Sequence, residues 1–302
     1  MISVMSRVVV ITTGGTIASV ADDRGVLRPA RTGAELLGDE GDRRVQVIDM
    51  MAKDSSQLTI ADWDRIASAI SAAVEDGTDG VVITHGTDTL EETALWLELT
   101  YDGAAPVVLT GAAKTADAPD ADGPTNLRDA VALAGSADAQ GLGVLICFGG
   151  AVLAPLGTHK GSAGFNGPEV VDRKERPFLG TVSAVAAPRV DVVACYLGAD
   201  AVALDACVAA GARGVVLEAL GAGNAGDLIV EAVQRHCAAG VTVAVSTRVP
   251  NGRVAASYGP GRALADAGAL VMPRLRPPQA RVLLMAALAT CSPVGEVVAR
   301  WG

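Results

Sequence analysis

Short runs of β-branched and other apolar residues recur along the first half of the chain, and small or polar residues follow each run. These runs occupy residues 8–11, 45–51, 81–84, 106–110 and 144–148. Runs of this length with almost no polar interruption are typical of strands that are buried on both faces of a sheet. The polar stretches that follow them are therefore expected at the carboxyl ends of the strands.

Between these runs the apolar residues return at helical spacing. A helix over residues 62–74 would carry one apolar side, formed by Trp63, Ile66, Ile70 and Val74. Further helices are predicted from residue 90 to about 101 and over residues 126–139. The alternation of buried strands with helices predicts an α/β fold with a parallel, doubly wound sheet.

The same alternation restarts in the second half as a smaller unit. Strands are predicted at residues 190–196, 214–220 and 241–246, with helices between them and a helix over residues 277–289. Residues 175–188 contain two prolines and are the predicted linker. We therefore expect a larger N-terminal α/β domain over residues 1–174 and a smaller C-terminal α/β domain over residues 189–302.

Composition indicates what the core consists of and disfavours some classes of partner. Half of the 302 residues are apolar but only 3% are aromatic, so the core is expected to consist of Ala, Val, Leu and Ile. The formal charge of −10 disfavours a nucleic-acid partner, because no basic face can be assembled against phosphate. Five widely spaced cysteines are expected to be reduced core residues rather than disulfides or metal ligands.

No apolar stretch approaches 18 uninterrupted residues, so no membrane partner is expected. The first eleven residues fit a strand better than the apolar region of a signal peptide, because a glycine-rich turn follows a short run. The expected location is the cytoplasm.

Residues 85–89, with the sequence His-Gly-Thr-Asp-Thr, come directly after the third predicted strand. Gly86 would let the backbone approach a ligand, and Thr87 and Asp88 offer a hydroxyl and a carboxylate. Open α/β sheets bind their ligands at this edge. Alternatively, Thr87 or Asp88 caps the next helix, with a following glutamate completing a capping box. Capping would account for one or two of these residues but not for the whole cluster.

Thr16 follows the first predicted strand and the adjacent glycines Gly14 and Gly15. Paired glycines allow a turn that few side chains would tolerate. The turn lacks both the dinucleotide pattern Gly-x-Gly-x-x-Gly and the phosphate-loop pattern Gly-Lys-Ser/Thr. The alternative role for Thr16 is a turn hydroxyl bonded to its own backbone. The polar residues 19–31 beyond it are expected to form either a lid or a solvated connector.

Hydroxyl groups thus follow three predicted strands, at Thr16, at Ser55 and Ser56, and at Thr87 beside Asp88. Side by side in one sheet, they would form a pocket of candidate nucleophiles next to a carboxylate. The chain has no Gly-x-Ser-x-Gly elbow, and its three histidines do not have the spacing of a zinc protease. A threonine nucleophile that is activated without histidine is unusual, so it restricts the enzyme families to which the chain can belong.

Two of these stretches resemble the signatures of the bacterial L-asparaginase family. Residues 13–18 resemble the first signature and residues 80–93 the second, in the correct order and about 70 residues apart. Residues 54–56, 121–127 and 279–283 also resemble family segments. The resemblance therefore extends along essentially the whole chain.

The resemblance implies hydrolysis of the side-chain amide of L-asparagine to L-aspartate and ammonia. Thr16 would attack the amide carbon and form an acyl-enzyme that water releases. Thr87, Asp88 and Lys160 would form a second constellation, in which Lys160 relays protons through Thr87. The sequence by itself allows either threonine to attack. No metal and no organic cofactor is implied.

The resemblance also implies how the substrate is held. Ser55 would bind its α-carboxylate and Asp88 its α-ammonium, with backbone N–H groups near Gly15 and Thr87 as oxyanion donors. The expected substrate-binding residues are Gly15, Ser55, Ser56, Gly86, Thr87, Asp88, Ala112 and Asn224.

The sequence departs from the family pattern in two places. The lid often carries a tyrosine close to the nucleophile, and residues 25–28 have none. Secreted members borrow a glutamate from a neighbouring subunit, whereas the comparable region here offers Tyr258; Asn224 matches the other contact between subunits. Because sites in this family form between subunits, a homodimer or homotetramer is expected.

Two alternatives to an asparaginase remain. The first is a component of a tRNA-dependent amidotransferase, which uses the same ammonia-releasing domain; the acidic charge and the lack of an extra N-terminal RNA-handling module argue against it. The second is a non-catalytic asparagine sensor. Binding alone would not require both Thr16 and Thr87 together with Lys160, which argues against a sensor.

Overall fold

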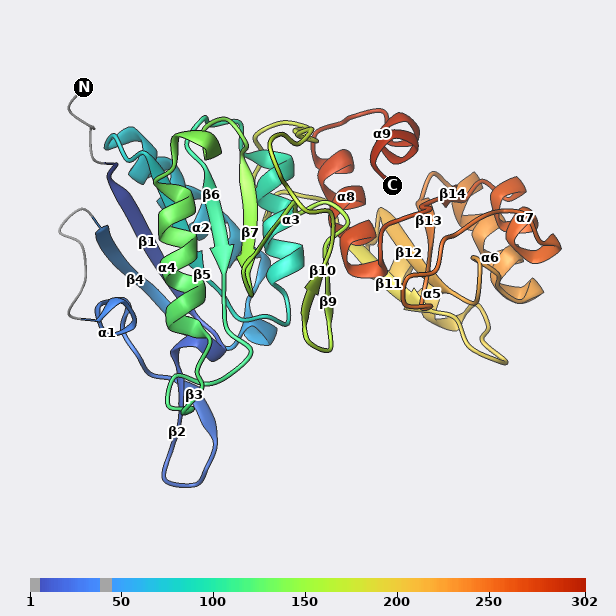
Figure 1. Cartoon of the computed structure of the whole chain (residues 1–302). Coiled ribbons are helices and arrows are strands. Elements are labelled where there is room, and N and C mark those ends of the chain that lie inside the picture. Colours follow the sequence, from blue (N-terminus) through green and yellow to red (C-terminus); the bar gives the residue numbers. More distant parts are fainter. Residues whose placement is uncertain (1–5, 39–44) are drawn as a thin grey trace. The chain divides into compact units, whose positions relative to one another are not determined.

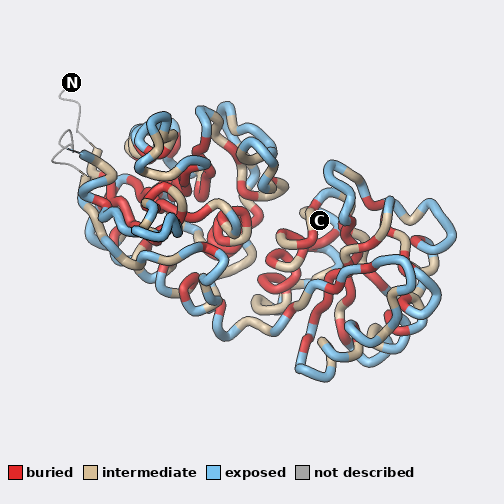
Figure 2. The backbone as a smooth tube through the Cα atoms, turned by 90° about the horizontal axis from the view of Figure 1, so that it is seen from below, coloured by how far each residue is buried: buried red, intermediate tan, exposed pale blue. Residues whose placement is uncertain are grey.

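The computed structural model describes residues 6–38 and 45–302, and the chain divides into two compact units, Met1–Phe178 and Leu179–Gly302 (Figure 1). The division falls inside residues 175–188; that this segment is a linker between domains 1–174 and 189–302 stays a prediction. Each unit has its own buried interior (Figure 2). No helix in the described residues is both long enough and apolar enough to cross a membrane.

The first unit contains a six-stranded sheet with the order β4-β1-β5-β6-β7-β8. Its strands are β1 (Val8–Gly14), β4 (Val45–Lys53), β5 (Gly80–Thr84), β6 (Val107–Thr110), β7 (Val144–Phe148) and β8 (Ala151–Leu153). The first five are parallel, which confirms the predicted fold class. The three-residue strand β8 was not predicted and pairs antiparallel with β7, so the sheet is mixed at this edge.

Helices cover both faces of this sheet (Figure 1). They are α1 (Gly33–Leu37), α2 (Ile60–Glu75), α3 (Leu90–Thr100) and α4 (Gly123–Ala134), with the 3-10 turns η1 (Thr16–Ala18), η2 (Ser55–Gln57) and η3 (Ala137–Ala139). Val9 and Ile11 of β1 pack with α2 and α3, whereas Val8 and Val10 pack with α4. This alternation explains why the strands are apolar at every position and confirms the doubly wound arrangement.

Two hairpins of three-residue strands occupy stretches that showed no clear period. They are β2 (Ser19–Ala21) with β3 (Leu27–Pro29), and β9 (His159–Gly161) with β10 (Gly164–Asn166). The Asp22 carboxylate holds the turn between β2 and β3, because it accepts hydrogen bonds from the backbone N–H groups of Arg24 and Val26, each at 2.9 Å. The polar residues 19–31 therefore form a hairpin that extends from the sheet end where β1 finishes (Figure 1).

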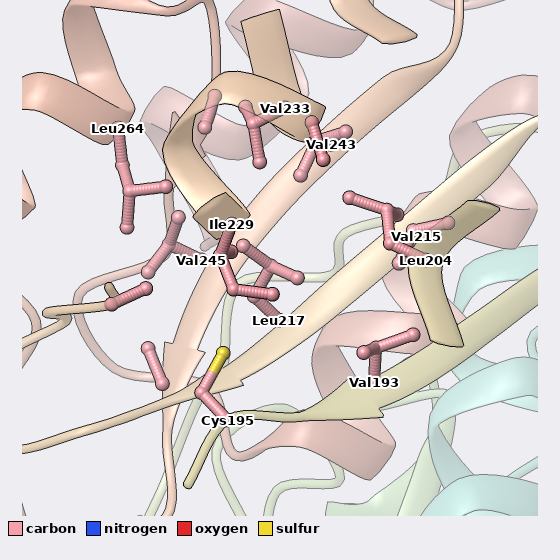
Figure 3. Packing of buried hydrophobic residues seen from close by; sticks show 14 of the residues in the cluster. Val193, Cys195, Leu204, Val215, Leu217, Ile229, Val233, Val243, Val245 and Leu264 are labelled. Atoms are coloured by element: carbon pink, nitrogen blue, oxygen red, sulfur yellow. The ribbon is translucent and has the colours of Figure 1, made fainter. Parts of the chain in front are cut away.

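The second unit has a four-stranded parallel sheet in the order β11-β12-β13-β14. Its elements are β11 (Val190–Ala194), α5 (Val202–Ala209), β12 (Gly214–Ala219), α6 (Asp227–Ala238), β13 (Thr242–Thr247), α7 (Gly259–Asp266), β14 (Leu270–Val271), α8 (Pro277–Ala289) and α9 (Val294–Trp301). Leu217 and Val245 of the sheet pack against Ile229 and Leu264 of α6 and α7 (Figure 3). Helix α7 was not predicted, since its first turn contains two glycines and a proline.

The cysteine prediction is correct in part. All five thiols are free, and Cys147 and Cys195 are buried. Cys291, however, is exposed just after α8 with a φ of 52°, so it is not a core residue. Its apolar sequence neighbours belong to the preceding helix, whereas Cys291 itself lies in the turn that ends it.

A buried ion pair joins the segment after β10 to α3. The Lys174 ammonium contacts Glu98 Oε1, and the two side chains are only 5% and 1% exposed. Glu98 Oε2 also accepts a 2.8 Å hydrogen bond from the Val144 N–H at the start of β7. Burial raises the pKa of Glu98 and lowers the pKa of Lys174, so each charge depends on the other to remain ionised.

Removing one partner of this pair should destabilise the protein far more than breaking an exposed pair. We expect Lys174→Met to lower the free energy of unfolding by about 3–5 kcal/mol, because it leaves the Glu98 carboxylate buried without the ammonium that pairs with it. Adding Glu98→Gln should recover much of the loss. Urea unfolding at neutral pH measures both effects.

Lys114→Met is the matched control, since Lys114 forms an exposed ion pair with Asp120. Its effect should be small, as exposed ion pairs contribute little. Equal destabilisation by the two lysine substitutions would contradict a structural role for the buried pair.

Candidate active site

The strand order creates a switch point in the first sheet. The chain passes from β1 to its neighbour β4 on one side and then returns to β5 on the other side. The crevice at the carboxyl ends of β1 and β5 is where open α/β sheets bind their ligands. Thr16 comes two residues after the end of β1, and Thr87 comes three residues after the end of β5. The fold therefore brings both threonine-bearing turns to one place.

These two turns touch through their glycines. Gly15 has a φ of 78°, and a Cβ on it would lie 2.4 Å from the N and Cα atoms of Gly86. A Cβ on Gly86 would lie 2.5 Å from Ser55 Oγ, at the start of the turn that follows β4. Thr89 Oγ1 adds a 3.0 Å hydrogen bond to the Ser55 carbonyl. Only glycine allows this approach, so the three predicted segments are in direct contact.

Thr16 is half-buried at the start of η1. Within residues 6–38 and 45–302 its hydroxyl has no hydrogen-bond partner, so the structure does not show the turn hydroxyl considered as an alternative. The hydroxyl of Ser19 instead donates to the Gly15 carbonyl at 2.9 Å. Ile17 is buried beside Ala112, the expected substrate contact after β6, and both lie close to Gly123 at the start of α4.

Asp88 and Lys160 meet although 72 residues separate them in sequence. Lys160 lies on β9, and its ammonium is 2.5 Å from Asp88 Oδ1, with the side chains 41% and 57% exposed. Thr89, rather than Thr87 or Asp88, directly precedes α3, and its side chain makes no capping hydrogen bond. The Thr87–Asp88 pair is therefore not used to cap the helix.

Ser56, a further expected substrate contact, is exposed beside Asp54. The Asp54 carboxylate accepts hydrogen bonds from Ser56 Oγ at 2.6 Å and Ser56 N at 2.8 Å. These bonds, assisted by the positive charge of Lys160, lower the pKa of Asp54. The turn after β4 thus carries a stable negative charge close to the Lys160 ammonium.

Glu91 holds the backbone of Lys160. The Lys160 N–H donates to Glu91 Oε2, from the first turn of α3. Glu91 is buried, and burial raises the pKa of its carboxyl to about 7. Lys160 is therefore fixed at both ends, by Glu91 at its main chain and by Asp88 at its ammonium. From the sequence this glutamate was expected only as part of a capping box, since nothing local shows its contact with β9.

Two residues of the segment 121–127 fix the loop after β6. Asp122 accepts hydrogen bonds from the N–H groups of Ala113 and Lys114, both at 2.9 Å. Asn126 Nδ2 donates to the Gly111 carbonyl at 3.0 Å, and a Cβ on Gly111 would lie 3.5 Å from Thr87 Cγ2. The segment resembles the family in sequence, but no role was predicted for these side chains. They shape the wall of the site beside Thr87.

Asn224, the remaining predicted contact, lies in the second unit. Its Oδ1 accepts a 3.1 Å hydrogen bond from the Gly261 N–H and so ties the loop after β12 to α7. Tyr258 immediately precedes α7 and is exposed. A substrate contact by Asn224 stays a prediction. Among the described residues, no group of three or more His, Cys, Asp or Glu side chains is placed to hold a metal ion.

Because the pKa of Glu91 is raised, the free energy of unfolding should depend on pH. Between the ordinary glutamate pKa of 4.5 and about 7, the folded protein keeps a proton that the unfolded chain releases, so the contribution of Glu91 to stability falls as pH rises. Glu91→Gln keeps an oxygen acceptor for Lys160 but does not titrate. The difference between the free energy of unfolding of Glu91→Gln and that of the parent should therefore rise by about 3 kcal/mol in favour of the variant from pH 4.5 to 8.

Chemical denaturation at a series of pH values measures this difference. Glu231→Gln, the same substitution at an exposed position on α6, is the matched control. A difference that is constant across this pH range would show that Glu91 is ionised throughout.

Comparison with known proteins identifies the family of this chain. Residues 7–189 match the family "Asparaginase, N-terminal", and residues 189–298 match "Glutaminase/Asparaginase C-terminal domain". The L-asparaginase of Bacillus licheniformis is 30% identical over 273 residues, covering 83% of this chain and 85% of that protein. L-asparaginase 2 of Bacillus subtilis (strain 168) is 32% identical over 236 residues, covering 70% of this chain but only 61% of that protein.

One component of the glutamyl-tRNA(Gln) amidotransferase of Methanosphaera stadtmanae is 37% identical over 147 residues, which cover 47% of this chain and 33% of that protein. Among solved structures, a probable cytoplasmic L-asparaginase from Campylobacter jejuni has a TM-score of 0.81 and 31% identity, covering 98% of this chain and 99% of that chain. The two family matches together span nearly the entire sequence. The chain therefore belongs to the asparaginase family.

Proposed function

We propose that this protein hydrolyses L-asparagine to L-aspartate and ammonia. The observation that carries this proposal is the contact between Gly15 and Gly86, which brings the Thr16 and Thr87 turns together at the switch point. Asp88, the residue after Thr87, pairs its carboxylate with the Lys160 ammonium. Relatives named L-asparaginase share both domains of the chain, which supports the same substrate class.

In the proposed reaction Thr16 Oγ attacks the side-chain amide carbon of asparagine. Its proton passes to the leaving nitrogen, which departs as ammonia and leaves an ester on Thr16. Water then cleaves this ester and releases aspartate. Thr87, polarised by the Lys160–Asp88 pair, would transfer protons in both steps. Backbone N–H groups of the glycine-rich turns would stabilise the negative oxygen.

Asp88 can serve both Lys160 and the substrate. Its Oδ1 atom contacts the Lys160 ammonium, and a carboxylate has a second oxygen with which to bind the substrate α-ammonium. Buried Ser55, placed against Gly86, would bind the α-carboxylate. We further propose a cytoplasmic homodimer or homotetramer in which Asn224 contacts the substrate from a neighbouring subunit. Light scattering on the purified protein tests the assembly.

The amidotransferase alternative has less support. The match to the amidotransferase component covers only a third of that protein, and the net charge of −10 is unfavourable for contact with tRNA. The direct test is ammonia release from L-asparagine and L-glutamine at equal concentrations. Release from asparagine supports the proposal. No release from either, with asparagine still raising the melting temperature, would identify a binding protein instead.

Thr16→Ala should abolish acyl-enzyme formation while leaving the fold intact, because it removes only the attacking hydroxyl. Mass spectrometry of the quenched reaction measures the acyl adduct, and circular dichroism reports on folding. Thr16→Ser, which retains a hydroxyl, should keep part of the activity. Near-normal turnover by Thr16→Ala would exclude Thr16 as the nucleophile.

Lys160→Met should lower kcat by a factor on the order of 10²–10⁴, the usual contribution of general acid–base assistance. Steady-state kinetics with asparagine separates kcat from KM. Lys114→Met is again the control and should leave both constants unchanged. If Lys160→Met alters KM alone, then Lys160 binds the substrate and does not transfer protons.

A further inference from the structure

A chain of three buried hydrogen bonds ends at the turn that carries Thr87. His85 is completely buried, and its Nδ1 lies 2.7 Å from the Gly86 carbonyl oxygen. Its Nε2 lies 2.9 Å from Thr93 Oγ1, which in turn accepts a 2.9 Å hydrogen bond from Trp63 Nε1. These three hydrogen bonds therefore connect α2 and α3 to the backbone of the candidate site. The proposed reaction does not use them.

The chemistry of these groups fixes every proton in the chain. The Gly86 carbonyl can only accept a hydrogen bond, so His85 Nδ1 must carry the hydrogen. Burial lowers the pKa of His85 to about 4, which leaves Nε2 without a proton at neutral pH. The indole of Trp63 can only donate, so the Thr93 hydroxyl directs its own hydrogen toward Nε2. All three hydrogen bonds consequently run in one direction, toward Gly86.

The Gly86 carbonyl and the Thr87 N–H belong to the same peptide unit. In a planar trans peptide these two bonds point in opposite directions. Because His85 holds the carbonyl oxygen, the Thr87 N–H must point the other way. It finds no acceptor anywhere in residues 6–38 and 45–302. Hydrogen bonding at the carbonyl also polarises the peptide and strengthens its N–H as a donor.

We propose that His85 is a positioning residue that holds the Gly86–Thr87 peptide so that the Thr87 N–H donates to the developing oxyanion. The role rests on the proposed hydrolysis, in which negative charge develops on the substrate carbonyl oxygen. His85 does not touch the substrate and transfers no proton. It acts through one rigid peptide, whose orientation is set from the helix side of the sheet.

Three variants of His85 separate this role from simple core packing. In His85→Asn the amide nitrogen occupies the place of Nδ1 and can still donate to Gly86. In His85→Gln the amide lies at the level of Nε2, so it keeps the reach to Thr93 but loses that donor. His85→Leu removes both. We expect kcat to fall in the Gln and Leu variants by a factor of up to about 10², below the 10²–10³ that loss of an oxyanion donor itself costs, because the Thr87 N–H remains in both.

His85→Asn should retain most of kcat, and KM should change little in all three variants. Thr93→Val is a second, milder change: it removes the hydroxyl that donates to Nε2, while the Gly86 carbonyl still requires the hydrogen on Nδ1. The ¹⁵N NMR shifts of His85 should show a neutral ring protonated at Nδ1 both in the parent and in Thr93→Val.

These outcomes distinguish the two proposals. If the parent releases no ammonia from asparagine or glutamine, the proposed function fails and the oxyanion role fails with it. If the parent is active but the three His85 variants lose kcat equally, or only in proportion to their melting temperatures, then His85 is merely a core residue. A parent ring protonated at Nε2 would also overturn the inference.

Discussion

The close approach of Gly15 to Gly86 is the constraint on which the candidate site depends. Two backbone turns meet where even a single methyl group would lie 2.4 Å from a main-chain atom. This contact fixes how the Thr16 and Thr87 turns sit side by side, and Ser55 packs against the same glycine. Each turn follows a different strand that is buried at every position, so the two turns start from rigidly packed backbone.

Buried polar side chains hold the backbone of the loops around this contact. His85 fixes one peptide of the Thr87 turn, Asn126 fixes the adjacent loop after β6, and Glu91 fixes the main chain of Lys160. None of these three side chains needs to reach the substrate in order to matter. A site held within a fraction of an ångström requires such supporting residues, because turns by themselves are flexible.

Other side chains of the site are open to solvent, unlike these buried supporting groups. Asp88 and Lys160 are both partly open to solvent, and the β2–β3 hairpin presents the exposed side chains Val26 and Leu27. Because Asp88 is partly open to solvent and contacts Lys160 through Oδ1, its second oxygen is available to a charged ligand. The hairpin lacks the tyrosine that lids of the family often carry, and its tip is apolar instead.

The sequence by itself determined the buried strands and the turns that follow them, because both are local. Apolar runs define β1, β5, β6 and β7, and the Gly15–Thr16 and Gly86–Asp88 turns are recognisable from their residues. The resemblance to a family then indicated which distant segments act together, including Lys160 with Asp88. The sequence did not decide which hydroxyl groups cap helices or bond to their own turns and which are available to a substrate.

Tertiary structure alone decided the rest. The strand order places β1 between β4 and β5, and no local pattern records it. Three-residue strands such as β9 are too short to show a period, so the element that carries Lys160 was not predicted. The contacts of Glu91 with Lys160 and of His85 with Thr93 and Trp63 join separate elements. Their chemistry appears only when packing removes those groups from water and leaves each with one available partner.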